Sequence, residues 1–545
     1  MELNPKISQA IQALRERTYF SAYPENPKAY SEESHETGKA TFQKQLSNPY
    51  VGLDEFGSTG KFGEEISPYM LVGLGVEYPV FTADFLVEQS QAAQSQWKKI
   101  SPLERANILV EMLDNVSDRF FELAYATMHT TGQSFVMSFQ ASGPHANDRA
   151  LESVALGYEE LTRYPQQLDW VKNMGKFDLT IKKNFKPVAK GVGLVIGCST
   201  FPTWNTVPGV FANLISGNSC IIKPHPKSVL PIAIVVEEMQ KVLSAHGLST
   251  KLVQLAVDSS ANPITKNLAE HHAVKLIDYT GGSDFGRYIE SLPGKTVFTE
   301  KAGVNSVILD GVADVKAVFG NLAFAASLYS GQMCTAPQNI FVSKDGINTP
   351  EGIMSYDDVV ASLGAALKGL AENPKMGAGT LGAIQNDVTR KRVEDVLSGA
   401  SASVNDAIVE NAEFSDARIL APSVVAVDAS DDSWKHECFG PILFVVKTSG
   451  REESLALAAH LAASVGAITC SCYSTDVAYM QSVEEVMNEQ AFTPVSFNFT
   501  GAAFVNQHAA FSDFHVTGGN PSGNATFTDS LYVNRRFVWV GNRFA

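Results

Sequence analysis

The sequence has too few cysteines for a disulfide-stabilised fold, and it lacks the spacing typical of a metal site. Six cysteines occur among 545 residues, and none of them forms a CxxC pair. The His271-His272 pair and His436 of "HEC" have no second ligand cluster at a suitable distance. We therefore expect no disulfide framework and no bound metal; the cysteines are Cys198, Cys220, Cys334, Cys438, Cys470 and Cys472.

Three further patterns are absent. No run of five like charges occurs, although the formal net charge is −16, and a broad nucleic-acid-binding face would need clustered Lys and Arg. No window approaches the ~20 apolar residues of a membrane span. The start, "MELNPKISQA", lacks the basic stretch and apolar core of a secretory signal. These absences predict a soluble, reduced, cytoplasmic protein with neither nucleic acid nor membrane as partner.

The sequence does contain the material for large cores. Apolar residues make up 45% of the chain, and its length predicts two or three domains. Helical patterns occupy the first third. In "SPLERANILVEMLDNVSDRFFELA", Ser101, Pro102 and Glu104 give the start signal of a helix, and apolar residues from Leu103 to Leu113 follow at helical spacing.

From Phe177 onward the pattern changes to strands alternating with helices. "FDLTIKKNF" alternates apolar and polar residues, which is typical of a half-exposed strand. Short apolar runs typical of strands buried on both faces follow, and a helical stretch between them ends at Gly247. Strand-helix alternation predicts a doubly wound parallel sheet. The runs cover residues 191–197, 219–223, 251–257 and 274–279.

A second α/β pattern occupies the later half of the chain. It includes a helix that ends near Tyr329 and further buried-strand runs. The segment after Asn520 is rich in Gly and Asn and then becomes strand-like in "LYVNRRFVWV". No internal repeat or low-complexity tract occurs. The strand runs cover residues 304–309, 338–343, 422–427 and 441–446.

Several motifs could carry chemistry, but each alone has a plain structural explanation. "TGGSDFG" follows a predicted strand and opens a helix, so amides at Gly281 and Gly282 could approach a pyrophosphate, although glycines mark any tight turn. Lys223 ends another strand, where a lone lysine is more often a solvated strand terminus than a ligand-binding residue. Cys334 in "SLYSGQMCTAPQNIFV" is either a small buried hydrophobe or a nucleophile.

Six motifs in one order carry a resemblance that none carries alone. "CSTFPTWN", "GNSCIIKP", "TGGSDFG", "TEKAGVNSVIL", "GQMC" and "ECFGPI" resemble the aldehyde dehydrogenase superfamily across nearly the whole chain. The spacings from Thr200 to Lys223 and from Glu300 to Cys334 agree with it. "RERTYFSAYPENPKAY", "GEEISPYMLVGLGVEYP" and "FSDFHVTGGNPSGNA" are similar to the stand-alone PaaN type of phenylacetic acid degradation protein.

The resemblance implies an α/β fold with a doubly wound Rossmann-type cofactor domain, an α/β catalytic domain and a small β oligomerisation element. We expect the N-terminal helical segment and NAD(P)-binding domain at 1–168 and 189–299. The catalytic domain would then cover 300–520, with oligomerisation strands at 169–188 and 521–545. The implied assembly is a homodimer or a homotetramer.

The resemblance also implies site residues. Cys334 would attack the aldehyde carbonyl to give a thiohemiacetal, and after hydride transfer a thioester would remain on it. Glu300 would activate the hydrolysing water. Lys223 and Glu437 would contact the two riboses of NADP or NAD, with Phe439 beside the nicotinamide end. The strand end at Ile196-Gly197 and the turn at Gly281-Gly282 complete the expected cofactor site.

One departure from the resemblance concerns the oxyanion. Most of the superfamily has an asparagine where this chain has Thr200. A hydroxyl can still donate a hydrogen bond, with the Cys334 backbone N–H as the other donor. We expect Thr200 to take this role, with Asn205 as the alternative.

A second departure concerns the cofactor. Many NAD-preferring members have a glutamate where this chain has Pro226, and His225 and Lys227 beside it are possible cations. We therefore expect NADP to be accepted at least as well as NAD. Lys301 and Ala302 stand where relatives usually have Leu and Gly, and a cation next to Glu300 could lower its basicity.

Three functions compete at this point. The leading one is oxidation of a small-molecule aldehyde to the free acid, and the family implies a semialdehyde of phenylacetate catabolism, with a CoA-linked form as one version. The runner-up is a CoA-acylating dehydrogenase, which Thr200 favours and Glu300 disfavours. The third is a catalytically inactive binding protein that keeps the fold.

Overall fold

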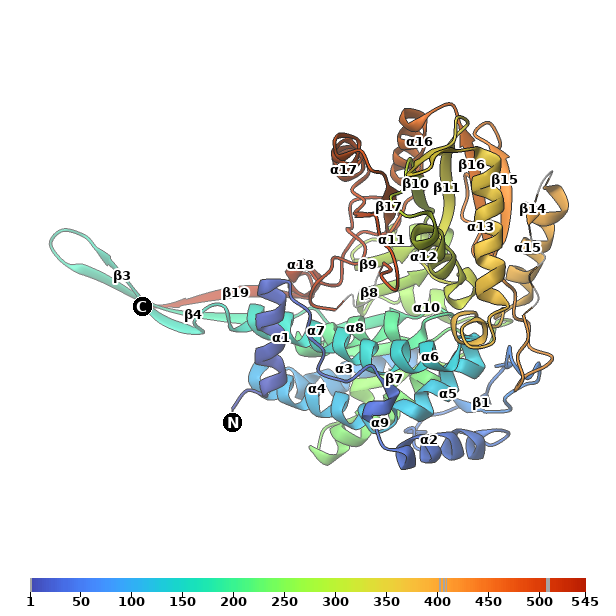
Figure 1. Cartoon of the computed structure of the whole chain (residues 1–545). Coiled ribbons are helices and arrows are strands. Elements are labelled where there is room, and N and C mark those ends of the chain that lie inside the picture. Colours follow the sequence, from blue (N-terminus) through green and yellow to red (C-terminus); the bar gives the residue numbers. More distant parts are fainter. Residues whose placement is uncertain (1, 401–402, 405–406, 408, 506–509) are drawn as a thin grey trace.

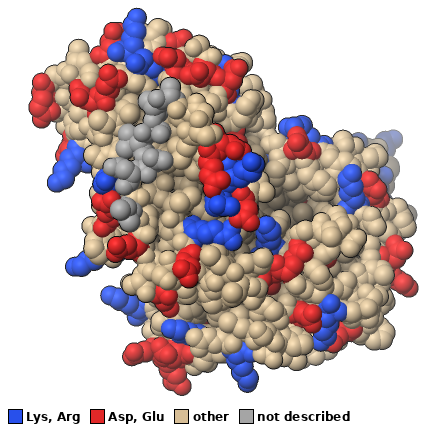
Figure 2. Space-filling view, turned by 90° about the vertical axis from the view of Figure 1, so that its right-hand side faces the viewer, with Lys and Arg blue, Asp and Glu red and all other residues tan. Residues whose placement is uncertain are grey.

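The computed structural model describes residues 2–400, 403–404, 407, 409–505 and 510–545 of the chain. Two mainly parallel sheets lie one above the other, and a long hairpin projects from one side (Figure 1). On the face shown in Figure 2 the surface is hollowed between the upper and lower parts, and charged side chains of both signs gather around the hollow. Within the described ranges, no helix is long and apolar enough to cross a membrane.

The lower sheet is the doubly wound parallel sheet that the sequence predicts. Its order is β7-β6-β5-β8-β9, and all neighbours are parallel. The direction of winding reverses between β5 and β8, and such a switch point leaves a ligand-binding crevice at the carboxyl ends of the strands. The strands are β5 (Val192–Ile196), β6 (Ser219–Lys223), β7 (Val253–Leu255), β8 (Val274–Gly281) and β9 (Thr296–Lys301).

Helices cover both faces of this sheet because its strands are apolar on both sides. Val195 and Ile222 face a core shared with α8 and α9, while Leu194 and Ile221 face a core shared with α3, α10 and α11. α9 ends just before Gly247, as predicted. The helices are α3 (Ala83–Trp97), α8 (Pro202–Ile215), α9 (Leu230–Ala245), α10 (Thr265–Glu270) and α11 (Ser283–Glu290).

The upper sheet has the order β14-β15-β16-β11-β10-β17-β18 and is parallel except at β14. It is formed by β10 (Asn305–Leu309), β11 (Pro337–Ser343), β14 (Ser403–Val404), β15 (Ser423–Asp428), β16 (Ile442–Thr448), β17 (Cys470–Tyr473) and β18 (Val495–Phe497). α12 (Val315–Ser327) and α13 (Tyr356–Ala371) pack on one face, and α16 (Arg451–Ser464) and α17 (Val477–Ala491) on the other. The predicted runs all fall on these strands.

The projecting sheet pairs β19 (Phe537–Phe544) with β4 (Asp178–Ala189), and β4 with β3 (Gln167–Asn173), all antiparallel. The predicted half-exposed strand is thus β4. "LYVNRRFVWV" is a strand only from Phe537, and its start belongs to α18 (Ser530–Asn534), so that prediction is wrong there. Asp529 caps α18 by accepting a hydrogen bond from the Leu531 N–H at 2.9 Å.

The first third of the chain is helical, as predicted. Ser101 caps α4, since its hydroxyl accepts a hydrogen bond from the Glu104 N–H at 3.2 Å. The helices are α1 (Pro5–Glu16), α2 (Glu32–Gln45), α4 (Pro102–Ser117), α5 (Phe120–Thr131), α6 (Phe135–Ser142) and α7 (Pro144–Thr162), with η1 at Pro27–Ala29. A small hairpin pairs β1 (Gly60–Phe62) with β2 (Tyr78–Val80).

Short elements complete the chain. η2 (Thr250–Leu252) is a single 3₁₀ turn, so the strand predicted over 251–257 is shorter than expected. The others are η3 (Leu328–Gly331), β12 (Ile347–Thr349), β13 (Gly352–Met354), α14 (Gly377–Thr380) and α15 (Asp387–Gly399).

A buried ion pair joins the C-terminal segment to the lower sheet. Arg536 donates to Asp278 on β8 through two bonds of 2.7 and 2.6 Å, and to Asn213 at 2.9 Å. The Tyr532 hydroxyl donates to the same carboxylate at 2.8 Å. This bidentate contact anchors the start of β19 on the sheet.

Candidate active site

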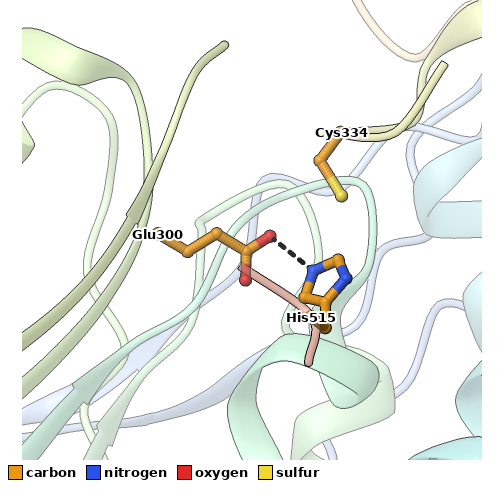
Figure 3. Close-up of side chains that lie close together, drawn as sticks. All are labelled: Glu300, Cys334 and His515. Carbon is orange, nitrogen blue, oxygen red and sulfur yellow. Dashed lines mark hydrogen bonds and ion pairs between the residues drawn. The ribbon is translucent and has the colours of Figure 1, made fainter. Parts of the chain in front are cut away.

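Three side chains from distant parts of the sequence point toward a common centre (Figure 3). Glu300 lies near the end of β9, Cys334 follows η3, and His515 comes from the C-terminal loop. His515 Nε2 lies 3.3 Å from Glu300 Oε1, and one ligand atom from each side chain lies within 4.8 Å of the other two. Glu300 is 2% and His515 3% exposed. A thiol, a carboxylate and an imidazole therefore share one enclosed site.

The loop that carries Cys334 has an unusual backbone. Tyr329 and Ser330 both have a φ of 51°, in the left-handed region that non-glycine residues rarely adopt. Gly331 follows with a φ of 68°, and a Cβ there would lie 2.5 Å from the carbonyl oxygen of Gly440. The "GQMC" and "ECFGPI" motifs are therefore in direct contact, and a side chain at Gly331 would separate them.

The pKa values of the Cys334 thiol and the Glu300 carboxyl group are shifted in opposite directions. Burial raises the pKa of Cys334 well above its usual value, and the charges of Glu300 and Cys198 raise it further. Burial also acts to raise the pKa of Glu300, but the neighbouring His515 and Arg149 outweigh it, so the pKa of Glu300 is lowered. At neutral pH, Glu300 is therefore a carboxylate beside a largely protonated thiol.

Two groups hold or balance the Glu300 carboxylate. Asn205 on α8 donates to Glu300 Oε2 at 3.1 Å. Arg149 on α7 lies with its guanidinium carbon 3.5 Å from the ring centroid of Trp204 and 4.4 Å from that of Phe527. Because these rings enclose it, Arg149 provides a fixed positive charge near the site without access to solvent.

Cys334 opens onto a cavity of about 70 Å³, which we name the Cys334 cavity. Aromatic and methionine side chains form much of its wall, and among the described lining residues there is no Lys, Arg, Asp or Glu. The cavity therefore suits an uncharged group next to the reacting carbon. Its apolar lining includes Met137, Phe201, Trp204, Met333 and Phe504.

The two candidate oxyanion donors, Thr200 and Asn205, are not among the described residues that line this cavity. Thr200 lies half-buried between β5 and α8, where its carbonyl accepts a hydrogen bond from Gln133 Nε2 at 2.7 Å. The Asn205 amide is engaged with Glu300. The observed contact thus makes Asn205 a partner of the carboxylate, and an oxyanion role for Thr200 stays a prediction.

The predicted cofactor residues flank the switch point of the lower sheet. Ile196 ends β5, and the Gly197 N–H donates to the Lys223 carbonyl at 3.0 Å. Gly281 ends β8 and Gly282 caps α11, where an added Cβ would meet no atom within 4 Å. The amino end of α11 therefore faces open space, which fits a pyrophosphate at a helix terminus.

Lys223 ends β6 but is buried, so the alternative of a solvated strand end is wrong. Its Nζ lies 2.7 Å from Asp258 Oδ1 and donates to the Pro224 carbonyl at 2.7 Å. Burial, together with the charges of Lys223 and Lys227, lowers the pKa of His225 to about 4. His225 is therefore uncharged at neutral pH in this structure, and its role as a cation beside a 2′-phosphate stays a prediction.

Glu437, Phe439 and Pro226 are half-buried. Burial raises the pKa of Glu437 to about 7, although a hydrogen bond from the Gly303 backbone opposes this. The Phe439 carbonyl accepts a hydrogen bond from Arg392 at 2.7 Å. Glu437 and Phe439 lie on the loop that contacts the Cys334 loop, which brings the two motifs to one region.

Lys301 points to a partner other than Glu300. Its Nζ lies 2.7 Å from Glu290 Oε1 on α11. The expectation that Lys301 lowers the basicity of Glu300 is therefore wrong, because the charges that lower the pKa of Glu300 belong to His515 and Arg149.

His515 is the residue that the sequence did not single out. It lies 215 positions from Glu300, inside "FSDFHVTGGNPSGNA", a segment whose resemblance assigns no role to the histidine. Sulfur, nitrogen and oxygen atoms this close could also bind a cation together. We assign no metal to them, since the thiol and the carboxylate are the groups that the aldehyde chemistry requires.

Comparisons with known proteins agree with this geometry. The model of the aldehyde dehydrogenase family matches residues 81–514. A solved NAD-dependent aldehyde dehydrogenase from Burkholderia multivorans is 40% identical, covers 99% of this chain and 97% of its own, and has a TM-score of 0.95. The chain therefore belongs to the aldehyde dehydrogenase family, and it is an oxidoreductase that acts on the aldehyde group.

More distant relatives carry another name. A 1-pyrroline-5-carboxylate dehydrogenase from Bacillus mycoides is 25% identical over 392 residues, which is 69% of this chain and 70% of the relative. A solved 1-pyrroline-5-carboxylate dehydrogenase from Thermus with bound NAD is 18% identical, with a TM-score of 0.74 over 97% of this chain and 99% of its own. The second likeness concerns the fold alone, and the predicted fold class is confirmed.

Proposed function

We propose that this chain oxidises an aldehyde to the carboxylic acid with NAD or NADP, through a thiohemiacetal and a thioester on Cys334. The observation that carries the proposal is the Cys334 thiol on an apolar cavity with the Glu300 carboxylate beside it. The bound dinucleotide supplies the hydride acceptor. Ile196, Gly197, Lys223, Gly281, Gly282, Glu437 and Phe439 would hold it.

The chain's own groups perform the remaining steps. Cys334 loses its proton to solvent water and adds to the carbonyl carbon, and the Cys334 N–H and the Thr200 hydroxyl would donate to the oxygen. The carbon would give its hydride to a dinucleotide held in the cofactor site, which would leave an acyl thioester on Sγ. Glu300 then takes a proton from water as the water attacks, and the thiolate leaves. The lowered pKa of Glu300 supports this role, since the base must be ionised.

We propose that the enzyme accepts NADP at least as readily as NAD. Pro226 replaces the glutamate that would repel a 2′-phosphate from this position, and Lys227 provides a cation. The carboxylates of Asp258 and Glu64 weigh against a preference for NADP. Their negative charges act on Lys223, which is expected to contact a ribose of the dinucleotide. Comparison of the two dinucleotides at equal enzyme and aldehyde concentrations tests it.

The proposed substrate is a semialdehyde of phenylacetate catabolism, in one form linked to CoA. The Cys334 cavity has a mainly apolar wall, with His145 as the one titratable side chain besides Cys334 among its described lining residues, and this supports an apolar segment next to the aldehyde. A substrate carboxylate next to the reacting carbon would meet no Lys or Arg among the described lining residues, and the more distant relatives are named for a carboxylate. A screen of aliphatic, aromatic, carboxylated and CoA-linked aldehydes tests this proposal, and highest kcat/KM with a short-chain carboxylated aldehyde, rather than with a longer or CoA-linked semialdehyde, would contradict it.

The CoA-acylating alternative keeps one supporting feature, Thr200. Glu300 argues against this alternative. Hydrolysis of the thioester needs an ionised base such as Glu300, whereas transfer of the acyl group to a thiol does not. We expect NAD(P)H formation without free CoA and release of the free acid. Absolute dependence on CoA would favour the alternative.

A homodimer or homotetramer in the cytoplasm is proposed as the working form. The projecting sheet of β3, β4 and β19 supports assembly, because it exposes apolar side chains on strands that extend beyond the body (Figure 1). Six free cysteines agree with a reducing compartment. Light scattering at micromolar concentration tests the assembly, and a monomer would contradict it. The exposed side chains include Val171, Phe177, Val538, Val540 and Phe544.

A further inference from the structure

Glu300 is enclosed between two different cavities. It is 2% exposed and lines neither of them. On one side Cys334 lines the Cys334 cavity, and on the other His515 lines a second cavity of about 570 Å³, which we name the His515 cavity. A proton that Glu300 accepts therefore has no direct path to solvent through either cavity, and His515 is its hydrogen-bonded neighbour on the open side.

The His515 cavity reaches the surface. Asp513 and Phe514 line it and are exposed, and Phe492 on its rim is 54% exposed. Phe504 lines both cavities, so the two lie next to each other. His515 thus contacts the buried base with one edge of its ring and belongs to the wall of a solvent-connected space.

Two aromatic rings hold the imidazole in this position. Trp204 meets His515 edge-to-face with ring centroids 4.9 Å apart, and Phe527 stacks on it at 6.2 Å. The same rings separate His515 from Arg149. The charged groups around His515 are therefore Glu300 in contact, Arg149 behind the rings, and Asp513 and Asp529 in the cavity wall. The contacting carboxylate is the group that would stabilise an imidazolium.

We propose that His515 carries protons between Glu300 and the solvent of the His515 cavity, a role that rests on the proposed aldehyde oxidation. When Glu300 has taken a proton from water, the neighbouring His515 imidazolium gives one proton to water in the His515 cavity. The carboxylic acid of Glu300 then gives its proton to the neutral imidazole at Nε2. Glu300 returns to the carboxylate, and His515 becomes an imidazolium again. Charge and protons balance, and no further reactant is needed.

The test compares two variants in the full-length enzyme. His515→Gln keeps a side chain that can hydrogen-bond Glu300 but cannot transport a proton, and His515→Ala opens room for a small base. We expect each variant to lower kcat by about 10²-fold, which is the lower end of the contribution that general acid–base catalysis makes to a rate. The KM for the aldehyde should change less than about threefold. Imidazole in the buffer should restore kcat of His515→Ala in proportion to its concentration, because it can reach Glu300 from the cavity.

Controls separate this role from a structural one. The parent and His246→Ala, a change at an exposed histidine on the surface, should not respond to imidazole. Full activity of His515→Gln would overturn the proposal, since a hydrogen bond alone would then suffice. A loss in His515→Ala that imidazole does not restore would also overturn it. Failure of the proposed function is a different result: the parent would then form no NAD(P)H with any aldehyde.

Discussion

Replacement of Glu300 by glutamine removes the base while keeping its surroundings. The side chain keeps its length, and its amide oxygen can still accept the hydrogen bond that Asn205 donates at 3.1 Å. The change therefore leaves the cavity shape intact and removes one proton acceptor. General-base catalysis contributes about 10²–10⁴-fold, equivalent to ~3–5 kcal/mol of transition-state stabilisation. We expect the steady-state kcat of Glu300→Gln to fall by that factor.

The assay follows the first and the later turnovers separately. Rapid mixing of Glu300→Gln with aldehyde and dinucleotide should give a burst of NAD(P)H that approaches one per subunit, followed by a slow steady state. The burst is expected because the thiol can still ionise to solvent, whereas hydrolysis of the thioester lacks its base. Asn205→Ala is the matched control: it keeps the carboxylate but removes one donor, so its kcat should fall about tenfold or less. Steady-state turnover of Glu300→Gln at the parent rate would refute the assignment.

Three further predictions concern the thiol, the cofactor and the fold. Alkylation of Cys334 by iodoacetamide in the apoenzyme should accelerate about tenfold per pH unit from pH 7 to pH 9, because burial raises its pKa and the thiolate fraction rises with pH until that pKa; a plateau already at pH 7 would contradict this. Lys227→Ala should lower kcat/KM for NADP about tenfold and leave that for NAD unchanged, and an equal loss with both dinucleotides would remove the lysine from 2′-phosphate recognition. Asp278→Asn should lower the free energy of unfolding by about 3–5 kcal/mol, because Arg536 would stay buried without its charge partner, and the double variant with Arg536→Met should recover most of the loss in chemical denaturation. Equal stability of the single variant and the parent would refute that account.

Much of the fold follows from local patterns in the sequence. The run at 191–197 and the centre of the run at 219–223 are apolar at successive positions, so both faces of these strands need cover, and this predicts a parallel sheet with helices on both sides. The start of α18 shows where such reasoning fails. "LYVN" is as apolar as a strand, but the capping side chain of Asp529 and the burial of Tyr532 turn it into a helix.

The site was predictable only in part, for a different reason. Glu300 lies near the end of β9 and Cys334 lies between η3 and β11, and the motifs around them are short and specific. His515 comes from a loop that reaches the site through contacts far away in the sequence, such as the hydrogen bond from the Phe511 N–H to Glu152 at 2.7 Å. The charge state of His225 likewise depends on burial, which the letters "KPHPK" do not contain.

The most direct measurement of the central claim is the mass of the peptide that contains Cys334. Glu300→Gln should be incubated with an accepted aldehyde and dinucleotide, stopped in acid and digested. The account predicts that this peptide gains the mass of the acyl group, and that Cys334→Ala gives neither the adduct nor turnover. An unmodified Cys334 peptide during the burst, or turnover by Cys334→Ala, would contradict the account.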